Sequence, residues 1–237
     1  MRLDKYLCEA GYGTRTEVKK IIKAGLVTHN GTKALRPEQK VMETDQVAVN
    51  GQKLSLCTVE YWMLHKPAGC VSATEDRALP TVIDYLPEEA RKDLFPVGRL
   101  DRDTEGLLLL TNDGKLAHYL LSPRRHVDKV YYARILGKVT EAHVEQFARG
   151  LDIGDEKETL PAALHILSSG PESEIQVTIR EGRYHQVKRM FEAIDCQVVY
   201  LKRLSMGSLI LDEALTPGDC RKLTEEELQK LKEDTGC

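Results

Sequence analysis

Three carboxylates stand at alternate positions in the segment Arg99 to Gly106, as Asp101, Asp103 and Glu105. In an extended segment they would share one face, so an acid and base pair of the glycosidase kind has to be considered. Ordinary salt bridges within a polar loop have the same spacing, and spacing alone does not separate the two. The segment runs directly into four leucines that read as a buried strand, and a rigid strand can position a carboxylate accurately.

Other reactive side chains show no site pattern. The six cysteines are scattered without a CxxC pair, and the seven histidines show no HExxH or other ligand spacing. We therefore expect reduced thiols and no metal. With 41% hydrophobic and 30% charged residues the chain has an ordinary globular composition, and we expect a folded, cytoplasmic protein without a membrane segment.

A short amphipathic helix is expected near the N-terminus. Thr14 and Glu17 have the spacing of a capping box, and Gly25 provides a stop signal. Apolar residues at helical spacing leave the opposite face basic, where a polyanion could bind or where lysines are merely solvated. That face carries Lys19, Lys20 and Lys23.

Two Asn-Gly pairs, Asn30-Gly31 and Asn50-Gly51, favour type I′ hairpin turns. Residues 1–50 hold nine Lys and Arg against six Asp and Glu, a net charge of +3, although the whole chain has a net charge of −3. The basic residues are therefore concentrated in the N-terminal part, which suits phosphate binding.

The rest of the chain mixes short β-rich runs with helical segments, without the regular alternation of a doubly wound sheet. We therefore expect an α+β protein with two domains, residues 1–56 and residues 57–237. The expected strands are 61–64, 107–111, 130–136, 162–167, 175–180 and 198–201. The expected helices are 116–121, 141–149, 185–194 and 225–232.

Two resemblances give these segments a function. Arg2-Leu3-Asp4-Lys5-Tyr6-Leu7, Thr14-Arg15 and Leu26-Val27-x-x-Asn30-Gly31 resemble the S4 (α-L) RNA-binding domain. Five later motifs resemble the S4-bearing pseudouridine synthases of the small-subunit rRNA type (RsuA type): His65-Lys66-Pro67-Ala68-Gly69, Val97 to Leu108, Thr111-Asn112-Asp113-Gly114, Lys129-Val130-Tyr131 and Glu181 to Met190. This family implies a mixed, mostly antiparallel sheet flanked by helices.

The resemblance implies three catalytic residues. Asp101 is the essential carboxylate, Tyr131 stacks on the target base, and Lys188 is the basic partner that keeps Asp101 ionised. Many relatives carry arginine in place of Lys188, and lysine keeps the charge without the bidentate geometry. Strand alternation sends Tyr131 and Tyr132 to opposite faces, so only one faces the site, and the motif favours Tyr131. Isomerising uridine consumes no other atom, so no cofactor is expected.

RNA contacts are expected from the N-terminal module and from segments around the catalytic residues. Arg99 is the candidate for filling the gap left by an extracted uridine or clamping a phosphate, with a salt bridge to Asp103 or Glu105 as the alternative. The remaining candidates come from the N-terminal module and from the segment around Lys188. They are Arg2, Lys5, Arg15, Lys19, Lys20, Lys23, Arg183, His185, Gln186 and Arg189.

The expected substrate is ribosomal RNA, and the stretch Ser122-Pro123-Arg124-Arg125-His126 resembles the branch acting on 16S rRNA, free or within a small-subunit assembly intermediate. A 23S rRNA enzyme of the same family and a non-catalytic S4-type assembly protein are the alternatives. A methyltransferase would need a Gly-rich cofactor loop, which the sequence lacks, and a glycoside hydrolase would leave the S4 module unexplained. The chain is expected to act as a monomer.

Overall fold

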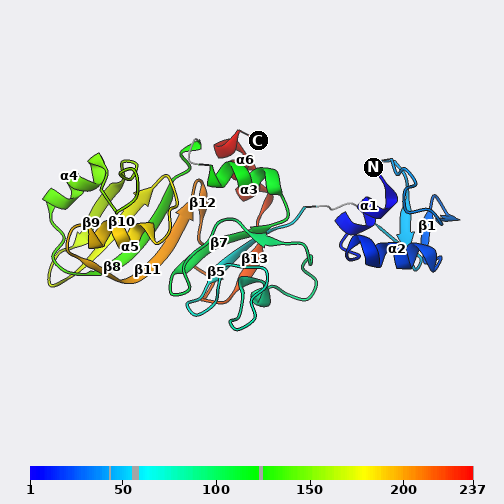
Figure 1. Cartoon of the computed structure of the whole chain (residues 1–237), viewed down its shortest axis with the longest axis horizontal. Helices are drawn as coiled ribbons and strands as arrows, with labels where there is room; N and C mark the ends of the chain where they lie inside the picture. The colour runs from blue at the N-terminus through cyan, green and yellow to red at the C-terminus, as the bar shows by residue number, and fades with distance from the viewer. Residues whose placement is uncertain (43, 55–58, 123–124, 237) are drawn as a thin grey trace. The chain divides into compact units, whose positions relative to one another are not determined.

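The computed structural model describes residues 1–42, 44–54, 59–122 and 125–236. The chain forms two compact units, Met1–Glu60 with Glu89–Asp93 and Tyr61–Glu88 with Leu94–Cys237 (Figure 1). The domain boundary expected between residues 56 and 57 lies outside the described residues, as do residues 123 and 124 of the stretch 122–126.

The N-terminal unit packs two helices on a small antiparallel sheet. The helices are α1 (Leu3–Glu9) and α2 (Arg15–Lys23), and the sheet order β2-β1-β3-β4 joins β1 (Val27–His29), β2 (Thr32–Lys33), β3 (Val47–Val49) and β4 (Gln52–Lys53). Its core consists of Leu3, Tyr6, Leu7, Val18, Ile22, Val27, Ala34, Val41, Val47 and Val49. The capping box at Thr14 and Glu17 is confirmed, with both of its hydrogen bonds present.

The two expected hairpin turns in this unit are also confirmed. Asn30 and Gly31 have φ of 50° and 78°, and Asn50 and Gly51 have φ of 51° and 80°. Glycine and asparagine adopt this left-handed region more readily than most residues, so these pairs favour two-residue loops, which set the strand register on either side.

The second unit is built on a nine-stranded sheet with the order β13-β5-β7-β11-β8-β10-β9, in which β12 pairs with β11 and β6 with β7. Among the strand pairings within the described residues only that of β7 with β11 is parallel, so the sheet is mixed and mostly antiparallel as expected. The strands are β5 (Tyr61–Lys66), β6 (Phe95–Pro96), β7 (Glu105–Thr111), β8 (Lys129–Leu136), β9 (Ala163–Ser168), β10 (Glu172–Ile179), β11 (Gln197–Met206), β12 (Leu209–Ile210) and β13 (Cys220–Lys222).

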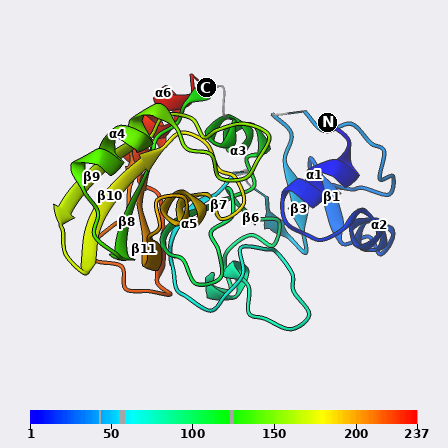
Figure 2. The same cartoon turned by 60° about the vertical axis from the view of Figure 1, so that its left-hand side comes forward.

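Helices flank this sheet. They are η1 (Val82–Tyr85), α3 (Gly114–Leu121), α4 (Glu141–Arg149), α5 (Gln186–Glu192) and α6 (Glu225–Thr235). α5 packs on β11, α4 packs on β9, and α3 and α6 pack together (Figure 2). The core shared by the strands with α3 and α6 contains Met63, Val97, Leu107, Leu109, Leu116, Ala117, Leu120, Val127, Met206, Leu209, Leu211 and Leu231.

Every strand and helix expected in this unit is present, and the expected α+β class is confirmed. The helix at 141–149 has its expected bounds, whereas β7 begins two residues before its leucine run and β11 extends five residues beyond 201. Such ends depend on pairing with neighbouring strands, which local sequence does not encode.

Candidate active site

The buried ammonium of Lys66 supports the loop that carries Asp101. This side chain is 0% exposed, and its Nζ donates to the carbonyl oxygens of Thr104 at 2.9 Å, Pro67 at 3.0 Å and Arg102 at 3.3 Å. Burial lowers the pKa of Lys66, although nearby carboxylates oppose that change. A cation at the end of β5 thus holds two carbonyl groups, those of Arg102 and Thr104, of the turn that runs from Asp101 to Thr104.

Two further contacts fix this loop. The buried Ser72 hydroxyl donates to Leu100 O at 2.8 Å and accepts from Leu100 N at 3.1 Å. Gly106 has φ of +104°, and a Cβ there would clash with the carbonyl oxygen of Arg203 on β11. Glycine is therefore required where β7 approaches β11 this closely. Asp101 stands on a backbone that is tied down at both ends.

Asp101 lies beside two basic side chains from the segment before and within α5. Lys188 Nζ is 3.2 Å from Asp101 Oδ2, and His185 Nε2 is 3.6 Å from Asp101 Oδ1. Lys188 makes a shorter contact of 2.6 Å with Oδ1 of Asp103. The Asp101 side chain is 25% exposed and that of Asp103 is 73% exposed. The structure thus places Lys188 between two carboxylates rather than on Asp101 alone.

The charges of this cluster stabilise one another. Burial lowers the pKa of Lys188, but hydrogen bonds to Asp103 and Asp101 more than compensate and raise it above its ordinary value. Burial likewise raises the pKa of Asp103, yet the hydrogen bond and charge of Lys188 hold it below its ordinary value. Lys188 is consequently a cation at neutral pH, placed to favour ionised carboxylates around it.

The third carboxylate of the original triplet does not belong to this cluster. Glu105 Oε2 accepts from the hydroxyl of Tyr200 at 2.7 Å, and burial together with this carboxylate raises the pKa of the Tyr200 phenol above its ordinary value. The turn after Asp101 prevents the three carboxylates from sharing a face. The geometry therefore does not support an acid and base pair of the glycosidase kind that includes Glu105.

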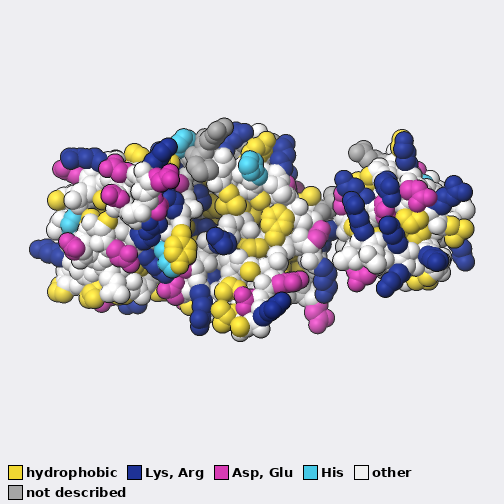
Figure 3. Space-filling model, in the orientation of Figure 1, with side chains coloured by type: hydrophobic (Ala, Val, Ile, Leu, Met, Phe, Trp, Pro, Cys, Tyr) yellow, Lys and Arg dark blue, Asp and Glu magenta, His cyan; other side chains and the backbone are white. Residues whose placement is uncertain are grey.

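Asp101 opens onto a cavity of about 820 Å³. Apolar residues, among them Val71, Leu100, Ile179 and Leu201, contribute to its lining, as does the 7% exposed Tyr131 on β8. Apolar and basic side chains lie close together in the middle of this unit in Figure 3. The volume accommodates a nucleoside, and its walls suit a flat base.

Tyr131 and Tyr132 point to opposite faces of β8, as strand alternation requires. Tyr131 lines the cavity, whereas the hydroxyl of Tyr132 donates to Glu174 at 2.8 Å and its ring packs edge-on to Tyr200 with 6.1 Å between centroids. The register of β8 thus puts the tyrosine favoured by the motif beside Asp101.

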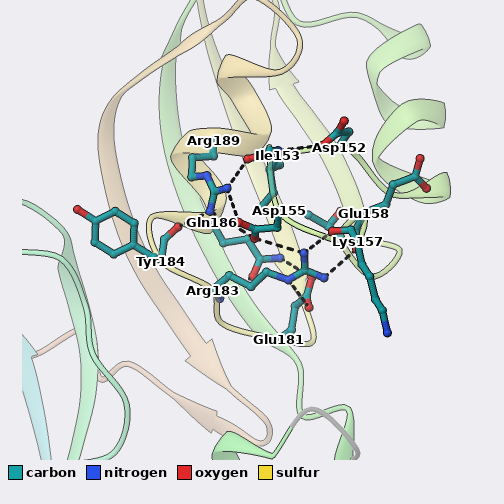
Figure 4. A network of polar contacts seen from close by, with 12 residues as sticks. Asp152, Ile153, Asp155, Lys157, Glu158, Glu181, Arg183, Tyr184, Gln186 and Arg189 are labelled. Atoms are coloured by element: carbon teal, nitrogen blue, oxygen red, sulfur yellow. Dashed lines mark hydrogen bonds and ion pairs between the residues drawn. The ribbon is translucent and has the colours of Figure 1, made fainter.

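Three of the side chains around α5 that were expected to contact RNA form hydrogen bonds and ion pairs within the protein instead (Figure 4). Arg183 donates to the carbonyl oxygens of Lys157 at 2.6 Å and Glu158 at 2.7 Å, and its Nε donates to Glu181 at 3.0 Å. Gln186 is 4% exposed and donates to Glu181 at 2.9 Å.

Arg189 is the third. It contacts Ile153 O and forms an ion pair of 2.6 Å with Asp155. These side chains bind the loop before β9 to the start of α5, and this geometry favours a positioning role over RNA contact. Of the α5 candidates, His185 remains accessible; it is stacked on the 73% exposed Tyr184 with ring centroids 3.8 Å apart.

Arg99 is exposed at the cavity, and in the described part of the chain no carboxylate lies within 4 Å of its guanidinium. The alternative of a salt bridge to Asp103 or Glu105 is therefore not seen. In the N-terminal unit, Arg2 forms a double hydrogen bond with Asp4 at 2.8 and 3.0 Å, and Lys5 lies 3.5 Å from Glu9.

The remaining basic candidates of the N-terminal unit are free to bind a polyanion. Arg15, Lys19, Lys20 and Lys23 are exposed, and no ion pair involving them occurs among the described residues. Figure 3 shows Lys and Arg side chains crowding the visible face of this unit.

The sequence did not single out two buried cations of the cavity, Lys129 and Arg203. Lys129 precedes Tyr131 by two residues, a spacing that could have placed it on the same strand face. No local signal marks Arg203, because only the pairing of β11 with β8 brings it to the cavity.

Two further searches of the structure concern metals and membranes. Within residues 1–42, 44–54, 59–122 and 125–236, no three His, Cys, Asp or Glu side chains gather as a metal site would require. None of the described helices is long and apolar enough to cross a membrane.

Comparison with known proteins finds matches over both units. A family model described as RNA pseudouridylate synthase matches residues 60–193, and one described as S4 domain matches residues 1–47. A solved crystal structure of a pseudouridylate synthase is 37% identical, with a TM-score of 0.69, covering 98% of this chain and 99% of that one.

Curated relatives match over nearly their full lengths. The "Uncharacterized RNA pseudouridine synthase YtzG" of Bacillus subtilis is 48% identical, covering 98% of this chain and 99% of the relative. "Ribosomal small subunit pseudouridine synthase A" is 42% identical in Vibrio cholerae, with coverages of 98% and 99%, and 40% identical in Escherichia coli K12, with coverages of 98% and 100%.

Proposed function

The chain belongs to the RNA pseudouridylate synthase family, and we propose that it converts a uridine of small-subunit (16S) ribosomal RNA into pseudouridine with Asp101 as the catalytic carboxylate. The observation that carries this proposal is the position of Asp101, which faces a base-sized cavity between the Lys188 ammonium at 3.2 Å and the wall formed by Tyr131.

The reaction needs a carboxylate beside the sugar. The bond from C1′ to N1 breaks, the uracil turns, and C1′ joins C5. Asp101 can start this either by attacking C1′ or by removing the proton from C2′, and both routes require the ionised form. The buried supports under the loop hold this carboxylate in place, so its reorganisation during the reaction is small.

The other two residues act on charge and on the base. Lys188 keeps positive charge against Asp101 and Asp103, and Tyr131 provides an aromatic face on which the detached uracil stacks. The apolar lining of the cavity excludes water, which would otherwise capture the reactive sugar.

RNA binding must offset the extraction of the uridine from its stack, which costs roughly a few kcal/mol. We assign this to the S4 domain, expected to span residues 1–56, through Arg15, Lys19, Lys20 and Lys23, and to Arg99 at the cavity of the catalytic domain, expected to span 57–237. Arg2, Lys5 and His185 complete the proposed contacts. The enzyme is proposed to act as a cytoplasmic monomer, on free RNA or on an assembly intermediate.

The decisive test replaces Asp101 by asparagine. Asp101→Asn keeps the shape of the side chain but removes its charge, so pseudouridine formation in small-subunit rRNA falls below detection while RNA affinity changes little. Asp195→Asn is the matched control, since Asp195 is exposed and its φ of 56° is one that asparagine also adopts. Normal modification by Asp101→Asn would overturn the assignment.

The target is tested separately. Pseudouridines are mapped in rRNA from cells with and without this protein. Loss of one site in 16S rRNA is expected, loss of a 23S site would move the substrate to the large subunit, and an unchanged map would favour a non-catalytic assembly protein.

A further inference from the structure

The sheet side of the active-site cavity holds two buried cations that form no ion pair with a carboxylate of the described residues. Arg203 is 2% exposed and Lys129 is 5% exposed, and both line the cavity. Among the described residues no Asp or Glu oxygen lies within 4 Å of either charge. Burying a charge without a partner is costly, and it is retained where an absent group completes the site.

Strand register places these cations around Tyr131. Arg203 on β11 is the direct partner of Tyr131 on β8, and directly paired residues share a sheet face. Lys129 precedes Tyr131 by two residues, so it lies on that face as well. Ile179 on β10 is paired with Lys129 and adds an apolar side chain to the cavity lining. The cations therefore stand beside the wall expected to receive the base, not at an outer phosphate-binding surface.

The guanidinium of Arg203 has hydrogen-bonding capacity to spare. Its Nε donates to Leu107 O at 2.7 Å, while its buried Nη2 has no hydrogen-bond partner in the part of the chain that the structure describes. Lys129 Nζ has a long contact of 3.3 Å with Val127 O. The close approach of Gly106 fixes the Arg203 backbone, and the hydrogen bond from Nε to Leu107 O holds its guanidinium. A buried donor left unpaired on a residue that lines the cavity points to a ligand acceptor.

The surroundings favour a ligand that becomes an anion. Burial and, to a smaller extent, the charge of Arg203 lower the pKa of Lys129 to about 8, although Asp128 and Glu181 oppose this change. Glu181 is itself occupied by Arg183 and Gln186. A negative charge between the two cations would relieve their repulsion.

We propose that Arg203 and Lys129 form an anion site that stabilises the uracil ring after it leaves the sugar, through its O2 and O4 oxygens. The inference rests on the proposed function and names two further catalytic residues for it.

The electron count requires such a site. When the bond between C1′ and N1 breaks, its electron pair stays on the base, and uracil becomes a monoanion whose charge is spread over N1, O2 and O4. This holds whether Asp101 forms an ester at C1′ or takes the proton of C2′. The electron pair then returns to C1′ from C5, and the C5 proton is replaced by one on N1, so no outside reactant is consumed. Fixed cations at the ring oxygens stabilise the anion without having to reorganise.

The first experiment varies the leaving group. Arg203→Gln should slow single-turnover breakage of the bond from C1′ to N1 of the target uridine by about 10²–10³-fold, with RNA affinity nearly unchanged. With 5-fluorouridine at the target, whose base carries negative charge more easily, the loss should shrink at least about tenfold. Arg134→Gln is the matched control, because Arg134 lies on the other face of β8 and pairs with Glu172 at 3.5 Å. An equal loss on both substrates, or a loss of RNA affinity alone, overturns the inference.

The second experiment needs neither turnover nor a variant. At neutral pH the wild-type chain should bind 5-nitrouracil, which is ionised, at least about tenfold more tightly than neutral uracil. Nitrouracil binding that is absent or no tighter overturns the inference even if Arg203→Gln does not fold. An active Asp101→Asn enzyme would refute the proposed function while leaving this binding comparison to stand by itself.

Discussion

Replacing Lys66 by methionine tests how the Asp101 loop is supported. Methionine matches the length of the lysine stem but cannot donate. The carbonyl of Arg102 keeps the donor N–H of Gly69 at 2.7 Å, whereas those of Thr104 and Pro67 lose the ammonium that now lies at 2.9 and 3.0 Å. Two poorly satisfied buried acceptors, less the relief from no longer burying a charge, should cost about 2–4 kcal/mol of unfolding free energy.

Lys66→Met should also lower the rate of pseudouridine formation. With Thr104 O no longer held, Asp101 can shift, and a misplacement of roughly 1 Å costs about 10²-fold in rate. Urea unfolding gives the stability, and single-turnover pseudouridine formation at saturating RNA gives the rate under conditions where both proteins are folded. Lys138→Met, which alters an exposed lysine after β8, is the control. A destabilised variant with an unchanged rate would show that Lys66 supports the fold but does not position Asp101.

Two more predictions follow from the charges. Reversing Lys19, Lys20 and Lys23 to glutamate should weaken RNA binding at low salt and lower the slope of log affinity against log salt by about 2, measured by filter binding; unchanged affinity would refute docking by the S4 helix. The pKa of Lys129 is lowered to about 8, so below that pH the native state holds a buried charge that the unfolded chain solvates, and this penalty shrinks as pH rises towards the ordinary value of 10.5. The change in unfolding free energy caused by Lys129→Met should therefore be more stabilising at pH 7 than at pH 9.5, by about 2 kcal/mol. Urea titrations of both proteins at the two pH values measure this difference. An equal effect at both pH values would contradict the lowered pKa of Lys129.

The local elements could be predicted because their signals are local. The capping box at Thr14, the Asn-Gly turns and the leucine run of β7 each depend on residues a few positions apart, and all appear where expected. The order of motifs also predicted the family, since five matching segments in sequence are far more specific than the spacing of three carboxylates. Their catalytic roles stay predictions until the variants are measured.

Other features depend on contacts across the fold. The motif predicted an RNA contact for Gln186, yet the residue is 4% exposed, and its amide donates to Glu181, which also accepts from the backbone of Leu160 in the loop before β9. The sequence alone does not predict that Arg183 and Arg189 form their hydrogen bonds and ion pairs with the loop before β9.

Residue types and local elements follow from the amino-acid sequence, because caps, turns and apolar periodicity act over a few residues. Which side chains meet at the site depends on contacts between segments that are far apart in the chain. Lys188 meets Asp103 across 85 positions, and Arg203 meets Tyr131 because β11 pairs with β8 in one register. A shift of one residue in that register would turn Arg203 to the other face of the sheet, and the cavity that Asp101 faces would lose this guanidinium.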